Sequence, residues 1–91
     1  MDLADIQIGQ WYASNNKDQP NYHFKASKID VLSKKVKVLK VGRWKHQPAG
    51  YGEMSNPDYW RNATPVNYSD IEHLIPDEFK ENRETEPLLF N

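Results

Sequence analysis

The chain has 91 residues, a formal net charge of -1 and no cysteine. That length indicates one domain with a small core, and the absence of cysteine excludes a disulfide framework and a Cys-based zinc site. The N-terminal segment lacks the basic and apolar regions of a signal peptide, and no apolar run approaches the ~18 residues of a membrane-spanning helix. We therefore expect a soluble, cytoplasmic protein without a membrane partner, and the sequence leaves the oligomeric state open.

Charge is unevenly distributed along the chain. Residues 23–46 contain eight lysines and arginines and one acid, whereas residues 70–86 contain seven acids and two basic residues. Such a division is typical either of two partner-binding surfaces or of two solvated surfaces that screen one another. The small net charge argues against a simple polyanion-binding protein.

The first predicted element is a strand at residues 5–8. Ile6 and Ile8 alternate with polar neighbours, which is the spacing of a strand with one buried face. Gly9 ends this alternation and predicts a bulge or a sharp bend before Trp11. Residues 14–21, SNNKDQPN, have the composition of a polar loop.

The strongest structural signal lies in residues 22–43, which we interpret as a hairpin with its turn at residues 32–35. This register places Ile29 opposite Val38. The other facing pairs are then Val31 with Val36, Asp30 with Lys37, Lys28 with Leu39, Ala26 with Val41 and Phe24 with Arg43. In that alignment both strands move their apolar residues to the other face at the same point. The pattern predicts a long, bent hairpin that contributes to two packed sheets.

Residues 43–60, RWKHQPAGYGEMSNPDYW, combine four large aromatic residues with two glycines and two prolines. This composition is unfavourable for a continuous strand or helix and unusually aromatic for a linker. We predict an inserted loop at residues 44–60 that partly covers the core and partly offers a recognition surface. Trp11 and Trp44 are expected in the core, whereas Tyr51 and Tyr59 are expected to be exposed.

The last predicted elements are a short strand and one helical turn within residues 62–76. Ser69 and Glu72 have the spacing of a capping box, and Pro76 ends the turn. Residues 77–91 form an acidic C-terminal extension, which begins with a weak helical signal and is expected to end as an extended or flexible segment.

This order of elements resembles that of an SH3-like small barrel, the architecture of Tudor, chromo-barrel and KOW-type modules. The resemblance covers about residues 5–76 and implies an all-β fold. We accordingly expect a five-stranded barrel at residues 1–76, with the aromatic loop inserted at 44–60 and a short helical or extended tail at 77–91.

A second likeness lies in Pro65, Asn67 and Tyr68, which resemble the Pro-x-Asn-Tyr segment of signalling SH3 domains. The early Ala-x-Tyr-x-Tyr signature of those domains has no match here, so polyproline binding is not carried over. Because small barrels serve many functions, the resemblance implies no particular partner.

Binding is the predicted function, and two partner classes remain open. A non-catalytic accessory or adaptor protein would bind a protein or peptide through exposed aromatic rings, or hold a cation in an aromatic cage. A nucleic-acid-binding barrel would instead place basic residues on phosphates and stack an aromatic ring on an unpaired base of single-stranded RNA or DNA. The predicted partner-binding residues are Lys40, Arg43, Trp44, Lys45, Tyr51, Tyr59 and Trp60.

Catalysis is not expected. The histidines, His23, His46 and His73, lack metal-ligand spacing, and Ser69 is explained by its capping role, so no metal, cofactor or catalytic nucleophile is predicted. A metal-free ribonuclease with His23 or His46 as its general base is a lower-ranked alternative.

The C-terminal sequence EPLLF, residues 86–90, resembles the short peptide by which bacterial proteins dock onto the replication sliding clamp. Leu89 and Phe90 match that motif, whereas Glu86 stands in place of its glutamine and Pro87 in place of a leucine. The resemblance makes Leu88, Leu89 and Phe90 a candidate docking segment of a clamp-binding accessory factor. Alternatively, these side chains pack on the barrel and close its apolar end.

Overall fold

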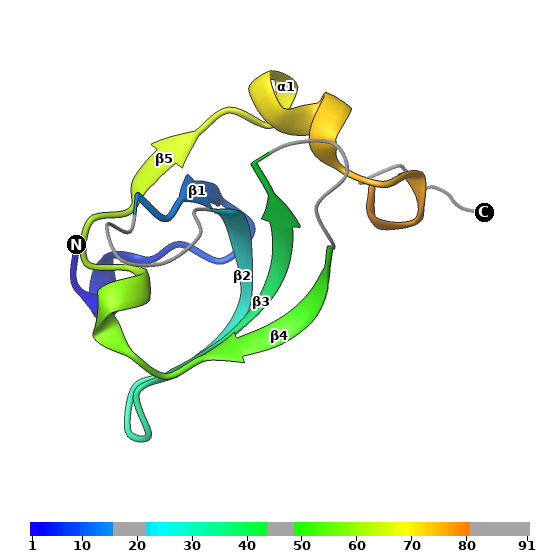
Figure 1. Ribbon diagram of the computed structural model, residues 1–91. Coiled ribbons are helices and arrows are strands. Elements are labelled where there is room, and N and C mark those ends of the chain that lie inside the picture. The colour runs from blue at the N-terminus through cyan, green and yellow to red at the C-terminus, as the bar shows by residue number, and fades with distance from the viewer. Residues whose placement is uncertain (16–21, 44–48, 81–91) are drawn as a thin grey trace.

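A computed structural model describes residues 1–15, 22–43 and 49–80, which form one antiparallel sheet of five strands in the order β4-β3-β2-β1-β5 (Figure 1). The strands are β1 (Trp11–Ala13), β2 (Tyr22–Asp30), β3 (Lys35–Gly42), β4 (Gly50–Met54) and β5 (Thr64–Val66). The helical turns are η1 (Leu3–Asp5), η2 (Pro57–Tyr59), α1 (Tyr68–Ile71), η3 (Glu72–Leu74) and η4 (Asp77–Phe79). No helix within these ranges is long and apolar enough to cross a membrane.

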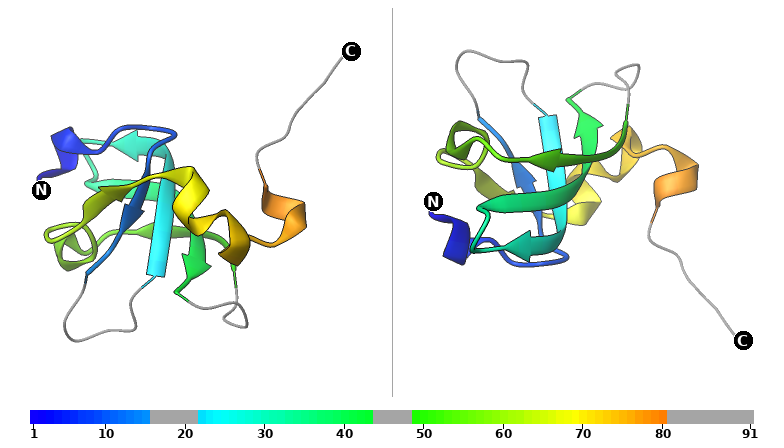
Figure 2. Two further views of the ribbon diagram at one scale, coloured as in Figure 1. Left: turned by 90° about the horizontal axis from the view of Figure 1, so that it is seen from above. Right: turned by 90° about the horizontal axis from the view of Figure 1, so that it is seen from below.

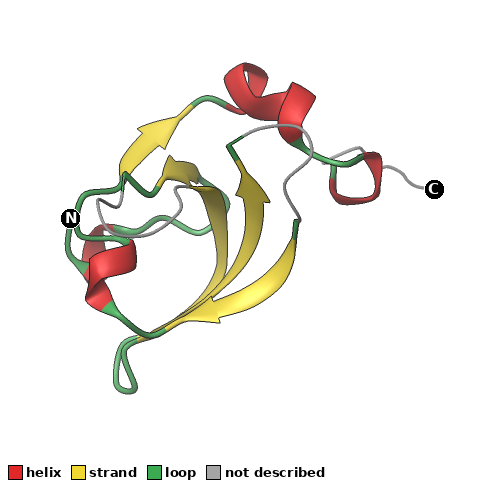
Figure 3. Cartoon of the chain, viewed as in Figure 1, coloured by secondary structure: helices red, strands yellow, loops and turns green. Residues whose placement is uncertain are grey.

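The sheet is strongly curved but open, because β4 and β5 form its two edges and do not pair with each other (Figure 3). The prediction of a mostly β fold with five strands is confirmed. The predicted closure into a barrel is not what the described strands show.

The long hairpin of β2 and β3 forms as predicted, but its register differs. Ile29 pairs with Val36 rather than Val38, and Asp30 and Lys35 close a turn at residues 31–34. The carboxylate of Asp30 fixes this turn, since its Oδ1 accepts hydrogen bonds from the N–H groups of Leu32 (3.1 Å) and Ser33 (3.2 Å). Local hydrogen bonding at the turn therefore sets the register, and the predicted facing pairs are wrong.

A bulge at Ser27 changes the side-chain alternation of β2. The ladder passes from Ala26–Val38 directly to Lys28–Lys37, which leaves Ser27 as the extra residue. As a result Phe24, Ala26 and Ile29 all contact the same cluster of buried residues, as set out below. The apolar residues therefore move from one face to the other only in β3, and not in both strands as predicted. The hairpin belongs to one sheet with two apolar faces, and the predicted two packed sheets are not observed.

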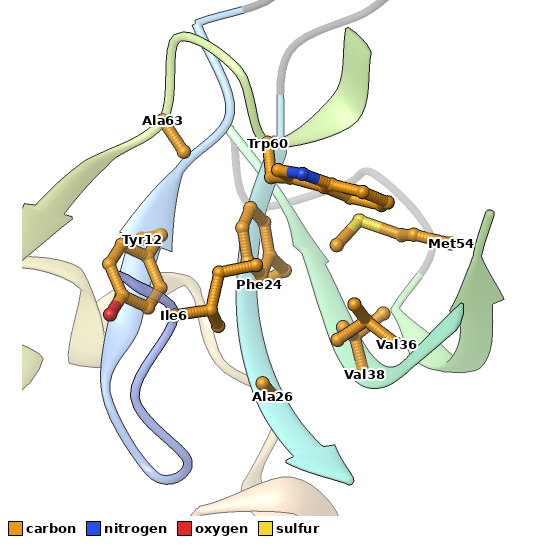
Figure 4. Close-up of a cluster of buried hydrophobic side chains, with 9 residues drawn as sticks. All are labelled: Ile6, Tyr12, Phe24, Ala26, Val36, Val38, Met54, Trp60 and Ala63. Atoms are coloured by element: carbon orange, nitrogen blue, oxygen red, sulfur yellow. The ribbon is translucent and has the colours of Figure 1, made fainter. Parts of the chain in front are cut away.

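The first face of the sheet carries the larger hydrophobic cluster (Figure 4). Its buried members are Ile6, Tyr12, Phe24, Ala26, Val36, Val38, Met54, Trp60 and Ala63. The rings of Tyr12 and Phe24 stack with their centroids 5.4 Å apart, and the Tyr12 hydroxyl accepts a hydrogen bond of 2.9 Å from the N–H of Gln7. We call this set the first cluster.

The second face is covered by the C-terminal helical turns (Figure 2). Its buried residues, the second cluster, are Trp11, Leu39, Val41, Ile71 and Ile75. The predicted helical turn is present as α1, which begins after Asn67 instead of Ser69 and is followed by η3, which ends before Pro76. The expectation that Trp11 lies in the core is confirmed.

Two further sequence predictions are corrected. Residues 6–8 form no strand, because the chain bends at Gly9, which has a φ of +89°, and the first strand begins only at Trp11. Residues 50–54, predicted as part of an inserted loop, form β4 along β3. The two glycines do not prevent this strand, because pairing with β3 uses the backbone alone, and a Cβ at Gly52 would meet the Lys40 side chain at an ordinary contact distance of 3.5 Å.

Candidate functional site

Tyr51 is the most exposed aromatic residue of the described chain. Its side chain lies on β4 opposite Leu39, on the second face of the sheet, and 77% of the residue is exposed. The ring packs edge-on against Phe79 of η4, with 5.5 Å between the centroids and 78° between the planes. Its predicted exposure is confirmed, and the contact with Phe79 leaves most of the residue accessible.

Lys40 and Tyr59, two other predicted partner-binding residues, contact each other on the first face. The Lys40 Nζ lies 5.3 Å from the ring centroid of Tyr22 and 5.8 Å from that of Tyr59. The two rings are 6.3 Å apart, so together they flank the ammonium group. The two rings therefore already contact a cation of the chain itself, the ammonium group of Lys40. Strand alternation places Lys40 on the face of the sheet opposite Tyr51.

Tyr22 belongs to this arrangement although sequence analysis did not select it as a functional residue. Its hydroxyl donates to the Sδ of Met54 over 3.5 Å. Burial first, and then the neighbouring Tyr59, raises the pKa of Tyr22 to about 12. The phenol therefore stays protonated at neutral pH and keeps its role as a donor.

Trp60 does not reach the surface with the other predicted residues. It is only 3% exposed and belongs to the first cluster. The preceding Tyr59 is half-buried against the same cluster, so its predicted exposure is wrong. Its position makes Trp60 a core residue in this conformation.

Arg43 lines a cavity of about 620 Å³ beyond the end of β3. The other lining residues are Gln10, His23, Pro65, Val66, Asn67, Asp70, Ile71 and Leu74. Gln10 is fixed there, because its Nε2 donates to the carbonyl groups of Trp11 (2.9 Å) and Val66 (3.0 Å). The Pro-x-Asn-Tyr segment thus contributes to a polar cavity between β5 and α1.

His23 is the buried titratable group of this cavity. It is 6% exposed, and its Nδ1 is one of two buried side-chain nitrogen or oxygen atoms in the described ranges that lack a hydrogen-bond partner. Burial lowers the pKa of His23, and the charges of Arg43 and His73 lower it further against the opposing effect of a hydrogen bond with the Gly42 backbone. His23 is therefore neutral at pH 7, and its use as a general base stays a prediction.

Little in the sequence indicates this cavity, because its lining residues are spread from position 10 to position 74. The only available signal was the Pro-x-Asn-Tyr likeness.

Trp44, Lys45 and His46 lie outside the described residues, as do Leu88, Leu89 and Phe90. Within residues 1–15, 22–43 and 49–80, no group of three or more histidine and acidic side chains could hold a metal ion.

Comparisons with known proteins add no assignment to this geometry. No family model matches the chain, and neither the curated proteins nor the solved structures contain a match. The functional argument therefore depends on the residues themselves.

Proposed function

We propose that this protein is a non-catalytic accessory or adaptor protein that binds an extended segment of another protein along β4. The observation that carries the proposal is Tyr51, a largely exposed aromatic ring on an edge strand. Exposed tyrosines are common anchors of protein interfaces, and edge strands offer unpaired main-chain groups to an added strand.

The composition of β4 supports this mode of binding. Among the described strands β4 pairs only with β3, so its second edge is available for main-chain hydrogen bonds. Gly50 and Gly52 carry no side chain, and a Cβ at Gly50 would meet no atom within 4 Å. A partner backbone would find little steric hindrance at Gly50, and the Tyr51 ring supplies an apolar contact on the opposite face of the strand.

We also propose that the sheet is an open form of the SH3-like architecture. The chain returns through the 3-10 turn η2 to place β5 beside β1, which gives the order β5-β1-β2-β3-β4. This order and the bent central hairpin support the resemblance, while the gap between β4 and β5 distinguishes this sheet from a closed barrel.

The proposal is tested by affinity capture from a native lysate, with and without nuclease, using the wild type, Tyr51→Ala and Tyr51→Phe. Loss of the ring should reduce the retained partner by about tenfold or more, as for interface hot spots, whereas Tyr51→Phe should retain most of it. Ile8→Ala, which truncates another exposed apolar residue, is the matched control.

Two outcomes would contradict this function. Equal capture by Tyr51→Ala and the wild type would remove Tyr51 from the interface. Capture that disappears after nuclease treatment would favour the nucleic-acid alternative. In that case, six neutralised phosphates would make affinity fall by about 10³-fold or more between 50 and 200 mM salt.

A further inference from the structure

The turn between β2 and β3 presents two adjacent apolar side chains to solvent. Leu32 is 96% exposed, and Val31 beside it is also exposed. The turn projects beyond the sheet near the end of β4 (Figure 3). The two hydrogen bonds to the Asp30 carboxylate shape this tip, where Leu32 is almost fully exposed and Val31 also borders a hollow beside Leu3 and Trp60.

Lysines surround this tip on the adjoining strands. Lys28, Lys35 and Lys37 line a hollow of about 230 Å³ together with Asp30, Ser33 and Glu53, and Lys34 lies in the turn itself. Lys28 and Lys37 face each other across the ladder. Like charges placed directly opposite destabilise a sheet, and Glu53 of β4, which pairs with Lys37 on its other side, offsets part of this repulsion. The hollow nevertheless contains three lysines against two acids, an excess of positive charge that suits an anionic partner.

We propose that residues 28–37, the hairpin tip, dock on the surface of an anionic lipid bilayer. Leu32 and Val31 enter the boundary between headgroups and acyl chains, and the surrounding lysines contact lipid phosphates. Such peripheral contact needs no membrane-spanning segment. It is therefore compatible with helices that are too short to cross a bilayer.

The shape of the tip favours a bilayer over other anionic partners. A protruding apolar side chain such as that of Leu32 fits a rigid protein only where that protein has a complementary pocket, whereas a fluid bilayer adapts to its shape. Residues 28–37 contain no aromatic ring, so the tip has nothing to stack on an unpaired base. The hollow contains two acids, Asp30 and Glu53, against three lysines, and Lys34 in the turn adds a further positive charge.

This docking would be independent of the β4 surface. Val36 pairs with Met54 at the tip end of β4, and Tyr51 lies three residues further along, about 10 Å away by the rise of a strand. A tip seated on a bilayer leaves Tyr51 accessible to a protein partner.

The absence of cysteine permits a direct test of insertion. Leu32→Cys is labelled with an environment-sensitive fluorophore and mixed with vesicles of phosphatidylcholine, either pure or containing phosphatidylserine. We expect a blue shift and increased emission only with phosphatidylserine. The same label at Ile8→Cys, an exposed apolar position outside the hairpin, should not respond.

Vesicle sedimentation then separates the charged and apolar contributions. Each lysine near an anionic surface contributes roughly a fivefold change in affinity, so Lys28→Gln with Lys37→Gln should weaken binding about 25-fold. Lys80→Gln, which removes one lysine charge next to η4, should leave it nearly unchanged, whereas Lys28→Gln alone should weaken binding about fivefold. Leu32→Ser should weaken binding about tenfold, against little change for Ile8→Ser. Thermal unfolding checks that every variant is folded.

Three results would overturn the proposal. The first is wild-type protein that does not bind phosphatidylserine vesicles, or binds neutral vesicles equally well. The second is a Leu32→Ser variant that binds like the wild type, which would leave charge attraction without insertion. The third is a single-stranded oligonucleotide that displaces the protein from vesicles and binds it with no dependence on Leu32, which would assign the lysines to nucleic acid.

Discussion

The two faces of the sheet differ in how completely their polar groups are satisfied. On the first face, nine buried residues pack together, and the tyrosine hydroxyls of Tyr12 and Tyr22 both take part in hydrogen bonds. On the second face, five residues form the cluster. Trp11 Nε1 and His23 Nδ1 are buried there without a hydrogen-bond partner among the described residues.

This difference supports the proposed division between a stabilising face and a partner-binding face. We expect the larger cluster, whose hydroxyls are hydrogen-bonded, to stabilise the fold more than the second cluster, since an unpaired buried polar group costs stability. The second face contains such unpaired groups, together with a cavity of about 620 Å³ and the exposed Tyr51. Buried polar groups left unpaired in native proteins often mark sites with another role.

The largest effect that should sharpen this comparison is that of Trp60→Ala on the first face. Removing a buried tryptophan typically lowers the free energy of unfolding by about 3–5 kcal/mol, a large share of the total for a domain of this size. Tyr51→Ala, from the same aromatic segment, should change it by less than ~0.5 kcal/mol. Urea unfolding followed by circular dichroism measures both.

If Trp60→Ala proves too unstable to study, Trp60→Phe retains an aromatic side chain and should show a smaller loss in the same assay. Equal losses for Tyr51→Ala and Trp60→Ala would contradict the division, because Tyr51 would then belong to the core.

The hairpin shows what sequence periodicity reveals and what it does not. Apolar alternation predicted a hairpin and two apolar faces because burial requires both. The register depended on the Asp30 side chain and on one extra residue, Ser27, and neither changes the apolar pattern enough to be recognised. β4 was missed because Gly50 and Gly52 pair through the backbone alone and leave no side-chain signal.

The candidate site was predicted only in part for a similar reason. Composition identified the aromatic segment, but Tyr51 and Trp60 are equivalent at that level. Only the fold separates them, by placing one on an edge strand and the other in the first cluster. The cavity around His23 combines distant segments, and single-sequence patterns do not report such contacts.

A second test concerns the hydroxyl of Tyr22 on the first face. Its pKa rises from 10.0 to about 12 on folding, so the neutral phenol is favoured in the folded state. The resulting stability is present below pH 10 and is lost as pH rises from 10 toward 12. Tyr22→Phe should lose less stability than the wild type over this interval, while lysine titration affects both proteins alike. Parallel curves for the two proteins would mean that the Tyr22 hydroxyl is solvated.

The smallest expected effect comes from His23 on the second face. Burial lowers its pKa below the ordinary value of 6.5, so the neutral ring is favoured in the folded protein. Its contribution is complete above pH 6.5 and is lost as pH falls below it, because the unfolded chain then binds the proton first. Between pH 7.5 and pH 5 the wild type should therefore lose more stability than His23→Gln. Identical pH dependence in His23→Gln and the wild type would show that the ring near Arg43 reaches solvent, and the second face would then lack the buried polar group that distinguishes it from the first.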